Sequence, residues 1–383
     1  MKLAFIIDNL GPYHVARLCA IAKLAEVLAI EVRQASSEYA WARTGSVPFR
    51  RLTLLVGNSV VDPRPLLCST LDAAAPDVVF TSGWGSAADL AALQWAGRQR
   101  VPVIVMSDSN ADDAPRRAPV EWVKQRLLAH VAGAFVAGTR SFEYATQLGI
   151  PSHMIRIGYD VVDNAHFAAR PDGARKGFIV SARFIQVKNL PFIMRAYAAY
   201  RDLHRIASAD ERPWTLNLVG DGALRNELEE LALGFRSDVV FRGFLQYEDL
   251  PSAYAGAGTL LLPSVKDTWG LVVNEGMAAG LPVLVSQRCG CVPDLLEEGV
   301  NGYALDPADQ AAWAKRMLFL ALMPSESRVA MGAASQRIVA RFSPETHAEA
   351  AVDLAGNALS RPLPRLRDLD ALLLSAAAAW RSM

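Results

Sequence analysis

Short apolar runs alternate with longer segments of helical spacing, and this alternation constrains the fold more than any other feature of the chain. The runs lie at 3–7, 29–35, 51–56, 77–81, 101–107 and 133–138 in the first half, and at 177–183, 215–220, 239–243, 259–263 and 282–286 in the second half. Continuous apolar strands separated by helices are typical of parallel sheets with both faces covered. The two sets of runs therefore predict two doubly wound, Rossmann-like α/β domains.

The length of the chain also favours two domains, since 383 residues exceed one ordinary core and suit two of about 150–200 residues. Helical and strand periodicity stops within 164–177, where Pro-Asp-Gly appears. We expect a first domain over 1–165 and a second over 166–343. A final helix at about 344–360 should open the remaining segment, 344–383.

Composition excludes several classes of protein. A hydrophobic content of 52% argues against disorder. The 39 basic and 39 acidic residues balance, so no overall field favours nucleic acid, and the pairs Arg50-Arg51 and Arg116-Arg117 are interpreted as solvated charges. The four cysteines form no disulfide framework or zinc pattern. Neither an export signal nor an apolar stretch of ~20 residues is present, which predicts a cytoplasmic protein.

An acid flanks each end of a small apolar run in SVKDTWGLVVNEGMAAG, residues 264–280: Asp267 and Glu275. A strand ends just before this segment, and a helix is expected to begin near Trp269 or Gly270 and to stop at Gly280. The free N–H groups of residues 269–271 attract an anion, whereas the carboxylates attract hydroxyl groups. A nucleotide sugar carries both kinds of group. The alternative is that Asp267 only caps the helix and Glu275 pairs with a surface Lys or Arg.

Other segments that follow predicted strands carry polar or flexible residues. Ligands of open parallel sheets lie at the carboxyl ends of the strands, so these loops are the candidates for function. Arg183 and Lys188 suit a diphosphate, or form a solvated charge pair. The remaining candidates are the tight turn Gly220-Asp221-Gly222, and Phe244 and Leu245, which line a base pocket or pack in the core.

Taken together, these segments resemble the retaining GT-B glycosyltransferases of the family 4 type, which include sucrose synthase and bacterial transferases of lipopolysaccharide and exopolysaccharide assembly. The resemblance covers nearly all of 177–310 and, more loosely, 1–165. The family pattern is Glu-x7-Glu, and here Asp267 takes the first position. GT-B implies two Rossmann-like domains that face a central cleft.

The resemblance also implies roles for individual residues. Arg183 and Lys188 would hold the donor diphosphate, and their charge would stabilise the departing group. Glu275 would accept the ribose hydroxyls. Asp267 would accept hydroxyls of the transferred sugar, near the amides of Trp269, Gly270 and Leu271.

No metal or other cofactor is expected beyond the nucleotide sugar itself. The one Asp-x-Asp motif, Asp368-Leu369-Asp370, lies in the terminal tail beyond both predicted sheets. It is interpreted as surface charge. The apolar stretch 371–380 is expected to pack against the body of the protein, and contact with a membrane surface is the alternative.

The first domain should hold the acceptor. Gly11 lies in the first post-strand loop, near the expected cleft, where it would contact the donor. His14 either touches ligand or packs the following helix. Trp84 and Ser86 follow another strand. Asp108 follows a third, in a Ser-Asp-Ser-Asn stretch where many relatives place a His, and a turn or cap is its alternative role.

Two further segments are similar to the family. Residues 158–167 look like its interdomain strand and loop, and the last helix of the family crosses back to the first domain. The prediction for the whole chain is a retaining hexosyltransferase that uses a UDP-sugar in preference to a GDP-sugar. Its acceptor would be a lipid-linked or cell-surface glycan, reached by peripheral contact with the inner face of the membrane. The alternatives are a two-lobed binding protein without chemistry, a silent subunit, or a nucleotide-sugar epimerase.

Overall fold

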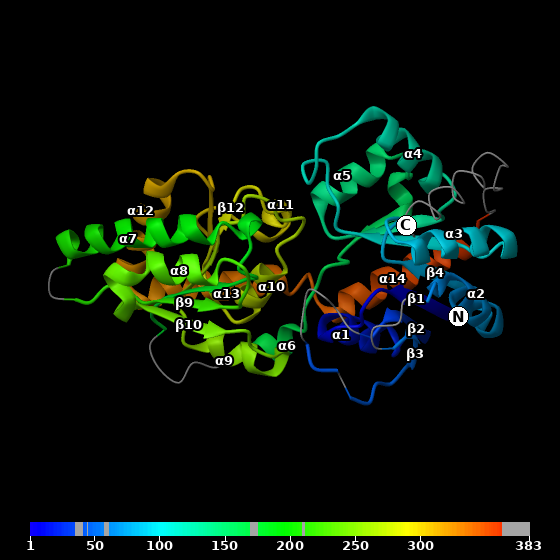
Figure 1. The fold of residues 1–383 in the computed structure, drawn as a ribbon, viewed down its shortest axis with the longest axis horizontal. Helices are drawn as coiled ribbons and strands as arrows, with labels where there is room; N and C mark the ends of the chain where they lie inside the picture. Colours follow the sequence, from blue (N-terminus) through cyan, green and yellow to red (C-terminus); the bar gives the residue numbers. More distant parts are fainter. Residues whose placement is uncertain (35–40, 44, 57–60, 169–174, 209–210, 362–383) are drawn as a thin grey trace. The chain divides into compact units, whose positions relative to one another are not determined.

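The computed structural model describes residues 1–34, 41–43, 45–56, 61–168, 175–208 and 211–361 (Figure 1). The chain divides into two compact units. The first consists of Met1–Val161 and the described chain from Pro344 on, and the second of Val162–Ser343. Each unit is a parallel sheet with helices on both faces, as the alternating apolar runs predict.

The first unit contains a seven-stranded parallel sheet in the order β3-β2-β1-β4-β5-β6-β7. Its strands are β1 (Lys2–Ile7), β2 (Glu26–Arg33), β3 (Arg50–Leu55), β4 (Val78–Thr81), β5 (Val103–Ser107), β6 (Gly133–Val136) and β7 (Ile155–Ile157). Its helices are α1 (Pro12–Ile21), α2 (Pro63–Ala74), α3 (Ala87–Gln99), α4 (Ala118–Leu128), α5 (Thr139–Gln147), the 3-10 turn η1 (Ser152–Met154) and α14 (Pro344–Leu359).

Alternate residues of the central strand β1 enter the two apolar layers of this unit. Phe5 packs on the layer that contains α1 and α14, where its ring stacks on Phe80 with centroids 4.4 Å apart. Ile6 points into the opposite layer, which α2 and α3 cover. A strand buried on both faces requires apolar residues at every position, which explains the unbroken run at 3–7.

The second unit contains a six-stranded parallel sheet in the order β10-β9-β8-β11-β12-β13. Its strands are β8 (Phe178–Ser181), β9 (Leu216–Val219), β10 (Val239–Gly243), β11 (Thr259–Leu262), β12 (Val283–Ser286) and β13 (Gly302–Leu305). Its helices are α6 (Asn164–Phe167), α7 (Leu190–Ala207), α8 (Arg225–Leu231), α9 (Leu250–Ala255), α10 (Leu271–Ala278), α11 (Val292–Leu295), α12 (Gln310–Leu322) and α13 (Ser325–Val339), with 3-10 turns η2 (Gln186–Lys188), η3 (Leu233–Asp238) and η4 (Tyr247–Asp249).

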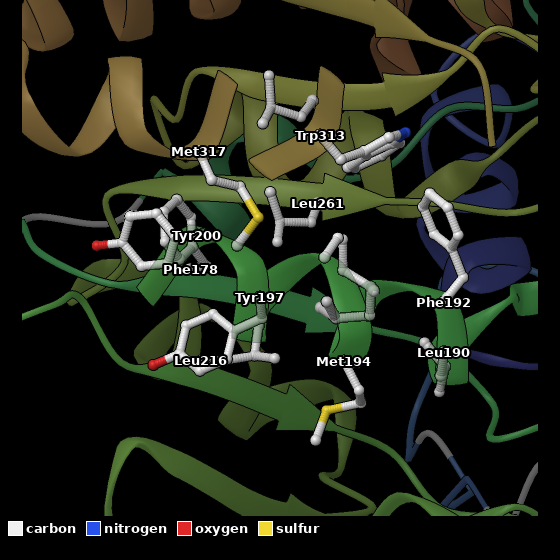
Figure 2. Packing of buried hydrophobic residues seen from close by; sticks show 14 of the residues in the cluster. Phe178, Leu190, Phe192, Met194, Tyr197, Tyr200, Leu216, Leu261, Trp313 and Met317 are labelled. Carbon is white, nitrogen blue, oxygen red and sulfur yellow. The ribbon is translucent and has the colours of Figure 1, made fainter. Parts of the chain in front are cut away.

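One face of this sheet is covered by α7 and α12. Figure 2 shows Tyr197 and Tyr200 of α7 and Trp313 of α12 packed over Phe178 and Leu261. Burying an aromatic side chain of this size contributes about 1.5–3 kcal/mol. The opposite face receives α10, which approaches β11 so closely that a Cβ on Gly276 would lie 2.7 Å from the side chain of Leu260.

All eleven apolar runs are strands, with ends displaced by at most three residues. Two short strands at the sheet edges, β7 and β13, were not predicted. Residues 158–167 do not contain the expected strand, because β7 ends before them and 164–167 form the helix α6. Phe167 of α6 is fully buried against the ring of Tyr254. The units accordingly divide after Val161 rather than after 165.

The terminal features named from the sequence fall partly outside the described residues. The helix expected at about 344–360 is α14, whereas Asp368, Asp370 and the apolar stretch 371–380 lie beyond the described chain. None of the helices in the described ranges combines the length and apolar character needed to cross a membrane.

Candidate functional site

The strand order of the second sheet reverses between β8 and β11. From β8 the chain moves outward to β9 and β10, and from β11 it moves the other way to β12 and β13. Such a reversal opens a crevice at the carboxyl ends of the two central strands, and ligands of doubly wound sheets bind there. Lys188 follows β8 and Asp267 follows β11, so both candidates come from loops at this crevice.

Lys188 and Asp267 are in direct contact. The Nζ of Lys188 donates to Oδ2 of Asp267 at 2.7 Å, and the wholly buried Ser264 donates its hydroxyl to the same oxygen at 3.2 Å. The two charged side chains are only 19% and 10% exposed. Both hydrogen bonds that described side chains donate to Asp267 fall on Oδ2.

Backbone hydrogen bonds fix the two loops to each other. The N–H of Val265 donates to the carbonyl of Val187 at 3.0 Å. Asn189, which adopts a left-handed conformation, donates its side-chain amide to the carbonyl of Pro263 at 3.2 Å. The contact between Lys188 and Asp267 is therefore set by the backbone and not by two flexible side chains alone.

The loop after β12 supports Asp267 from a third side. Asp267 bridges to Cys289, and the N–H of Gly290 donates to the Asp267 carbonyl at 3.0 Å. A Cβ at Gly290 would lie 1.8 Å from the carbonyl oxygen of Thr268, so only glycine fits. Cys289 and Cys291 are both buried.

The helix after this loop is α10, which begins at Leu271 and ends at Ala278. Its N-cap is Gly270, whose φ of +99° favours glycine, and no side chain caps the helix. The alternative of Asp267 as a helix cap is therefore wrong. Trp269 offers a ligand only its backbone, since its ring is buried and donates to Oδ1 of Asn274 at 2.9 Å.

Glu275 lies inside the unit, near the start of α10. Its side chain is 2% exposed, and Oε2 accepts a hydrogen bond of 2.6 Å from the hydroxyl of Tyr254. A buried carboxylate does not fit the alternative of a surface ion pair. An ionised group at this depth needs hydrogen bonds to offset the loss of water, and Tyr254 supplies one of them.

Arg183 lies two residues beyond β8, at the same edge of the sheet. The turn after β9 packs against the backbone beside it: a Cβ on Gly220 would lie 1.9 Å from the carbonyl of Ala182, and one on Gly222 would lie 2.7 Å from that of Phe184. Both glycines have positive φ. This tight turn therefore packs closely on the β8 loop. Within the turn, the carboxylate of Asp221 accepts a hydrogen bond from the N–H of Gly222.

Phe244 and Leu245 follow β10, at the far side of the β9 turn. The two loops are joined by a hydrogen bond of 2.7 Å from the N–H of Gly220 to the carbonyl of Gly243. Phe244 is 39% exposed. The alternative of core packing therefore fails for Phe244, whose ring can stack on a planar ligand.

In the first unit the strand order reverses between β1 and β4. Gly11 is the N-cap of α1, with extended backbone and room for a Cβ 3.6 Å from Trp41. His14 follows in the first turn of α1. Burial, with the charge of Arg17, lowers the pKa of His14 to about 3, so the ring is neutral at physiological pH. Its Nδ1 is buried and has no hydrogen-bond partner among the described residues, which suits the packing role given as its alternative.

The loop after β4 carries Trp84, which is half-buried, and Ser86, which caps α3. Ser86 and Asp89 form a capping box, with the serine hydroxyl 2.7 Å from the Asp89 carboxylate. Burial raises the pKa of Asp89 to about 6 despite these hydrogen bonds. Asp89 was not predicted, because its position inside a helical segment reads as an ordinary first-turn acid.

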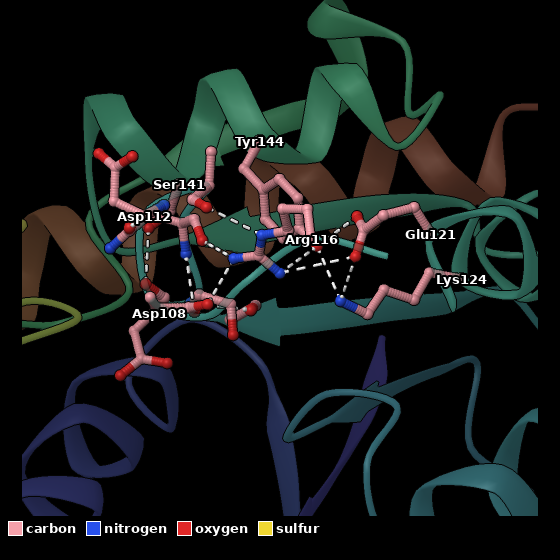
Figure 3. Close-up of polar contacts among 12 residues, drawn as sticks. Asp108, Asp112, Arg116, Glu121, Lys124, Ser141 and Tyr144 are labelled. Carbon is pink, nitrogen blue, oxygen red and sulfur yellow. Dashed lines mark hydrogen bonds and ion pairs between the residues drawn. The ribbon is translucent and has the colours of Figure 1, made fainter. Parts of the chain in front are cut away.

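Asp108 follows β5, in a loop that a polar network holds in place (Figure 3). The hydroxyl of Ser141 donates to the Asp108 carbonyl at 2.9 Å. Arg116 donates to the carbonyls of Asn110 and Ala111, to the Asp113 carboxylate, and to the hydroxyl of Tyr144. This network anchors the loop through its backbone.

The interpretation of the pairs Arg50-Arg51 and Arg116-Arg117 as solvated charges is wrong for one arginine of each pair. Arg116 is 25% exposed within the network of Figure 3. Arg51 is 10% exposed and donates at 3.0 Å to both oxygens of Glu31, which is almost fully buried. Sequence shows the charges but not the acids and carbonyls that face them.

A metal site is not evident in the part of the chain that the structure describes. Three or more His, Cys, Asp or Glu side chains do not converge anywhere in those ranges. The loops at the crevice of the second unit instead carry a cation, Lys188, paired with a carboxylate, Asp267.

Two Rossmann-like parallel-sheet domains define the GT-B glycosyltransferase fold. Residues 175–322 match the family model described as glycosyl transferases group 1, and this span contains Arg183, Lys188, Asp267 and Glu275.

Proteins that the chain resembles in sequence include two named transferases. A sulfoquinovosyl transferase of Arabidopsis thaliana is 35% identical over 127 residues, 32% of this chain and 24% of the relative. A GDP-mannose-dependent alpha-mannosyltransferase of Corynebacterium glutamicum is 28% identical over 283 residues, 69% of this chain and 63% of the relative. The aligned region therefore spans less than two thirds of the length of either relative. By their names, both relatives are transferases.

The solved structures show the fold. HepE of Anabaena in complex with UDP-glucose has a TM-score of 0.72 at 18% identity, over 93% of this chain and 100% of HepE. Sucrose-phosphate synthase of Thermosynechococcus elongatus has a TM-score of 0.68 at 18% identity, over 92% and 98% of the two chains.

Proposed function

We propose that the protein is a retaining glycosyltransferase that moves a sugar from a nucleoside diphosphate to a glycan acceptor. The observation that carries the proposal is the contact between Lys188 and Asp267 at the strand-order reversal of the second sheet. A cation and a carboxylate side by side match a ligand in which a phosphate adjoins a sugar hydroxyl.

Each group at the crevice has a role in this proposal. Arg183 and Lys188 bind the diphosphate, with the backbone N–H groups at the entrance of α10 beside them. Oδ1 of Asp267 accepts a hydroxyl of the transferred sugar, and Glu275 accepts the ribose hydroxyls. Phe244 and Leu245 face the base, next to the turn formed by Gly220, Asp221 and Gly222.

In the transfer step, the bond between the anomeric carbon and the donor phosphate oxygen breaks, and the diphosphate leaves with its electron pair. The acceptor oxygen bonds to the same face of the anomeric carbon, and a donor phosphate oxygen takes the acceptor proton. Preorganised cations stabilise the charge of the departing group. Losing one such group typically costs on the order of 10²-fold in rate.

UDP is proposed as the nucleotide ahead of GDP, with no metal required. Similarity to a structure that contains UDP-glucose supports the first nucleotide, and similarity to a GDP-mannose-dependent enzyme keeps the second in the test. The first unit is proposed to bind the acceptor, a lipid-linked or cell-surface glycan, through His14, Trp84 and Asp108, whereas Gly11 is proposed to contact the donor. Such an acceptor would be reached by peripheral contact with the membrane.

The deciding experiment measures nucleotide binding and then chemistry. UDP, GDP and ADP are screened for an increase in melting temperature, since a ligand of the folded state stabilises it. Slow hydrolysis of the matching nucleotide sugar is then followed in the wild type, in Lys188→Ala and in the control Lys315→Ala, which removes an exposed lysine of α12.

Hydrolysis that is lost in Lys188→Ala and kept in Lys315→Ala supports the enzyme. A second outcome is that the protein binds the nucleotide but neither hydrolyses the nucleotide sugar nor forms a product with an acceptor mixture. That result would favour a binding protein or a silent subunit. Release of the C2 epimer from UDP-N-acetylglucosamine in the absence of an acceptor would favour an epimerase.

A further inference from the structure

Tyr254 joins three elements of the second unit through one hydroxyl group. Its side chain is fully buried, and the hydroxyl lies 2.6 Å from Oε2 of Glu275 on α10. The same hydroxyl is hydrogen-bonded to the side chain of Ser181, the last residue of β8. Helix α9, strand β8 and helix α10 therefore meet at this oxygen, immediately beside the loop that carries Arg183.

The proton in the short contact belongs to Tyr254. Burial, and then the neighbouring Glu275, raise the pKa of the phenol well above its ordinary value. The phenol accordingly stays protonated and donates, while the carboxylate accepts. Hydrogen bonds of this charge-assisted kind are short and contribute about twice as much as neutral ones.

We infer that Tyr254 is a positioning residue for ribose recognition: it fixes the Glu275 carboxylate at Oε2 and thereby sets the direction in which the carboxylate meets the 2′- and 3′-hydroxyls of a ribonucleotide. The inference rests on the proposed function, in which Glu275 binds the ribose. It makes Tyr254 a determinant of the preference for ribose over deoxyribose, although the tyrosine itself does not touch the nucleotide.

A purely structural tyrosine in the same unit shows a different pattern of bonding. Tyr197 is equally buried, but its hydroxyl donates to backbone carbonyls, those of Trp214 at 2.8 Å and Asp238 at 3.1 Å. The hydroxyl of Tyr254 instead bonds an ionisable side chain one turn inside the helix entrance. A carboxylate free to rotate loses affinity for a diol, because ordering it on binding costs side-chain entropy.

The test compares two ligands that differ only in the ribose hydroxyls. Binding of UDP and of 2′,3′-dideoxy-UDP is measured by calorimetry in the wild type and in Tyr254→Phe, or with the guanosine pair if the thermal screen selects GDP. We expect UDP binding to weaken about fivefold in Tyr254→Phe, as for the loss of one hydrogen bond. Binding of the dideoxy compound should change by less than twofold.

A second arm tests whether Tyr254 acts through Glu275. Residues that act as one unit give non-additive effects, so Tyr254→Phe should weaken UDP binding no further in a Glu275→Gln background. Tyr197→Phe is the matched control: it removes a buried hydroxyl from the same unit and should leave the ratio of the two affinities unchanged.

The outcomes distinguish a failure of the positioning role of Tyr254 from a failure of the proposed function. If Tyr254→Phe weakens both ligands by the same factor, or weakens neither, the positioning role is refuted while the proposed function stands. If the wild type binds none of UDP, GDP and their dideoxy forms, the proposed function itself is refuted. A loss of UDP affinity that is equally large in Tyr197→Phe would reduce Tyr254 to core packing.

Discussion

The ammonium group of Lys188 and the carboxylate of Asp267 share a hydrogen bond of 2.7 Å at the point where the second sheet reverses its strand order. Each is more than four fifths buried, so the attraction is screened less than in a surface ion pair. An ammonium has three protons to donate. Two of its protons therefore remain for the phosphate oxygen that we propose Lys188 to bind while it keeps Asp267.

The length of the acidic side chain at position 267 should affect the rate or the donor preference of transfer, whereas its negative charge should be required for transfer. Asp267→Glu restores the family pattern and is expected to retain transfer or to shift the preferred donor sugar. Asp267→Ala removes the hydroxyl acceptor and should lower kcat/KM on the order of 10²-fold or more. Steady-state rates with several nucleotide sugars check this. Wild-type rates in both variants would limit Asp267 to a structural role.

Asp267→Asn should separate product binding from chemistry. The Asp267 carboxylate repels a diphosphate held by Lys188, and at an effective dielectric constant of ~20 such a repulsion amounts to a few kcal/mol before salt screening. We expect Asn to tighten binding of free UDP roughly tenfold, while transfer falls. Titration calorimetry at two salt concentrations measures the effect, which should shrink at the higher one. Weaker UDP binding would contradict the repulsion.

Chelation should leave activity unchanged. The groups proposed to neutralise the donor diphosphate are Arg183 and Lys188, so no divalent ion is needed for that purpose. Initial rates are compared before and after dialysis against EDTA. Complete loss of rate, with recovery on adding magnesium or manganese, would replace the proposed cation pair with a metal.

Acid should destabilise the first unit through His347. Its ring is buried on α14, Nδ1 lies 2.9 Å from the carbonyl of Gly158, and burial lowers its pKa to about 3. The unfolded chain binds this proton at about pH 6.5, so the stability is complete above that value and is lost as the pH falls towards 3.

At pH 5 the loss attributable to His347 should be about 2 kcal/mol, from a slope of about 1.4 kcal/mol per pH unit. Urea unfolding at pH 7, 6 and 5 should show a shallower decline for His347→Gln than for the wild type. Asp89, whose raised pKa of about 6 contributes with the opposite sign, is present in both proteins and cancels in the difference. Parallel declines would mean that His347 is protonated in the folded state.

Arg116 should contribute to stability, whereas its neighbour Arg117 should not. Arg116→Ala removes the guanidinium that donates to the carbonyls of Asn110 and Ala111, and we expect a loss of about 1–3 kcal/mol in the free energy of unfolding. Arg117 is exposed, so Arg117→Ala should stay within about 0.5 kcal/mol of the wild type. Equal effects of the two substitutions would show that the network in Figure 3 adds no stability.

The sheets could be predicted because parallel strands are buried on both faces and leave continuous apolar runs in the sequence. The two missed strands, β7 and β13, are three and four residues long and lie at sheet edges, where less burial is needed and the pattern is weak. The loops that carry Lys188 and Asp267 could be placed at one sheet edge from strand order alone.

The partners of those residues could not be predicted. Ser264 reads as an ordinary loop serine, and Tyr254 as an apolar residue of a helix. Their roles depend on contacts with Asp267 and Glu275 that exist only after the chain has folded. The same holds for Arg116, whose backbone acceptors carry no sequence signal.

The last described helix, α14, belongs to the first unit although the whole second unit precedes it in the chain. Its buried side chains, among them Ala351, Leu354 and Ala358, complete one apolar layer over the first sheet. Expression of residues 1–161 alone would leave that layer open to water. A stand-alone version of this unit would have to splice the segment from 344 directly onto 161, and a nascent chain emerging from the ribosome cannot finish its first core until the second has been made.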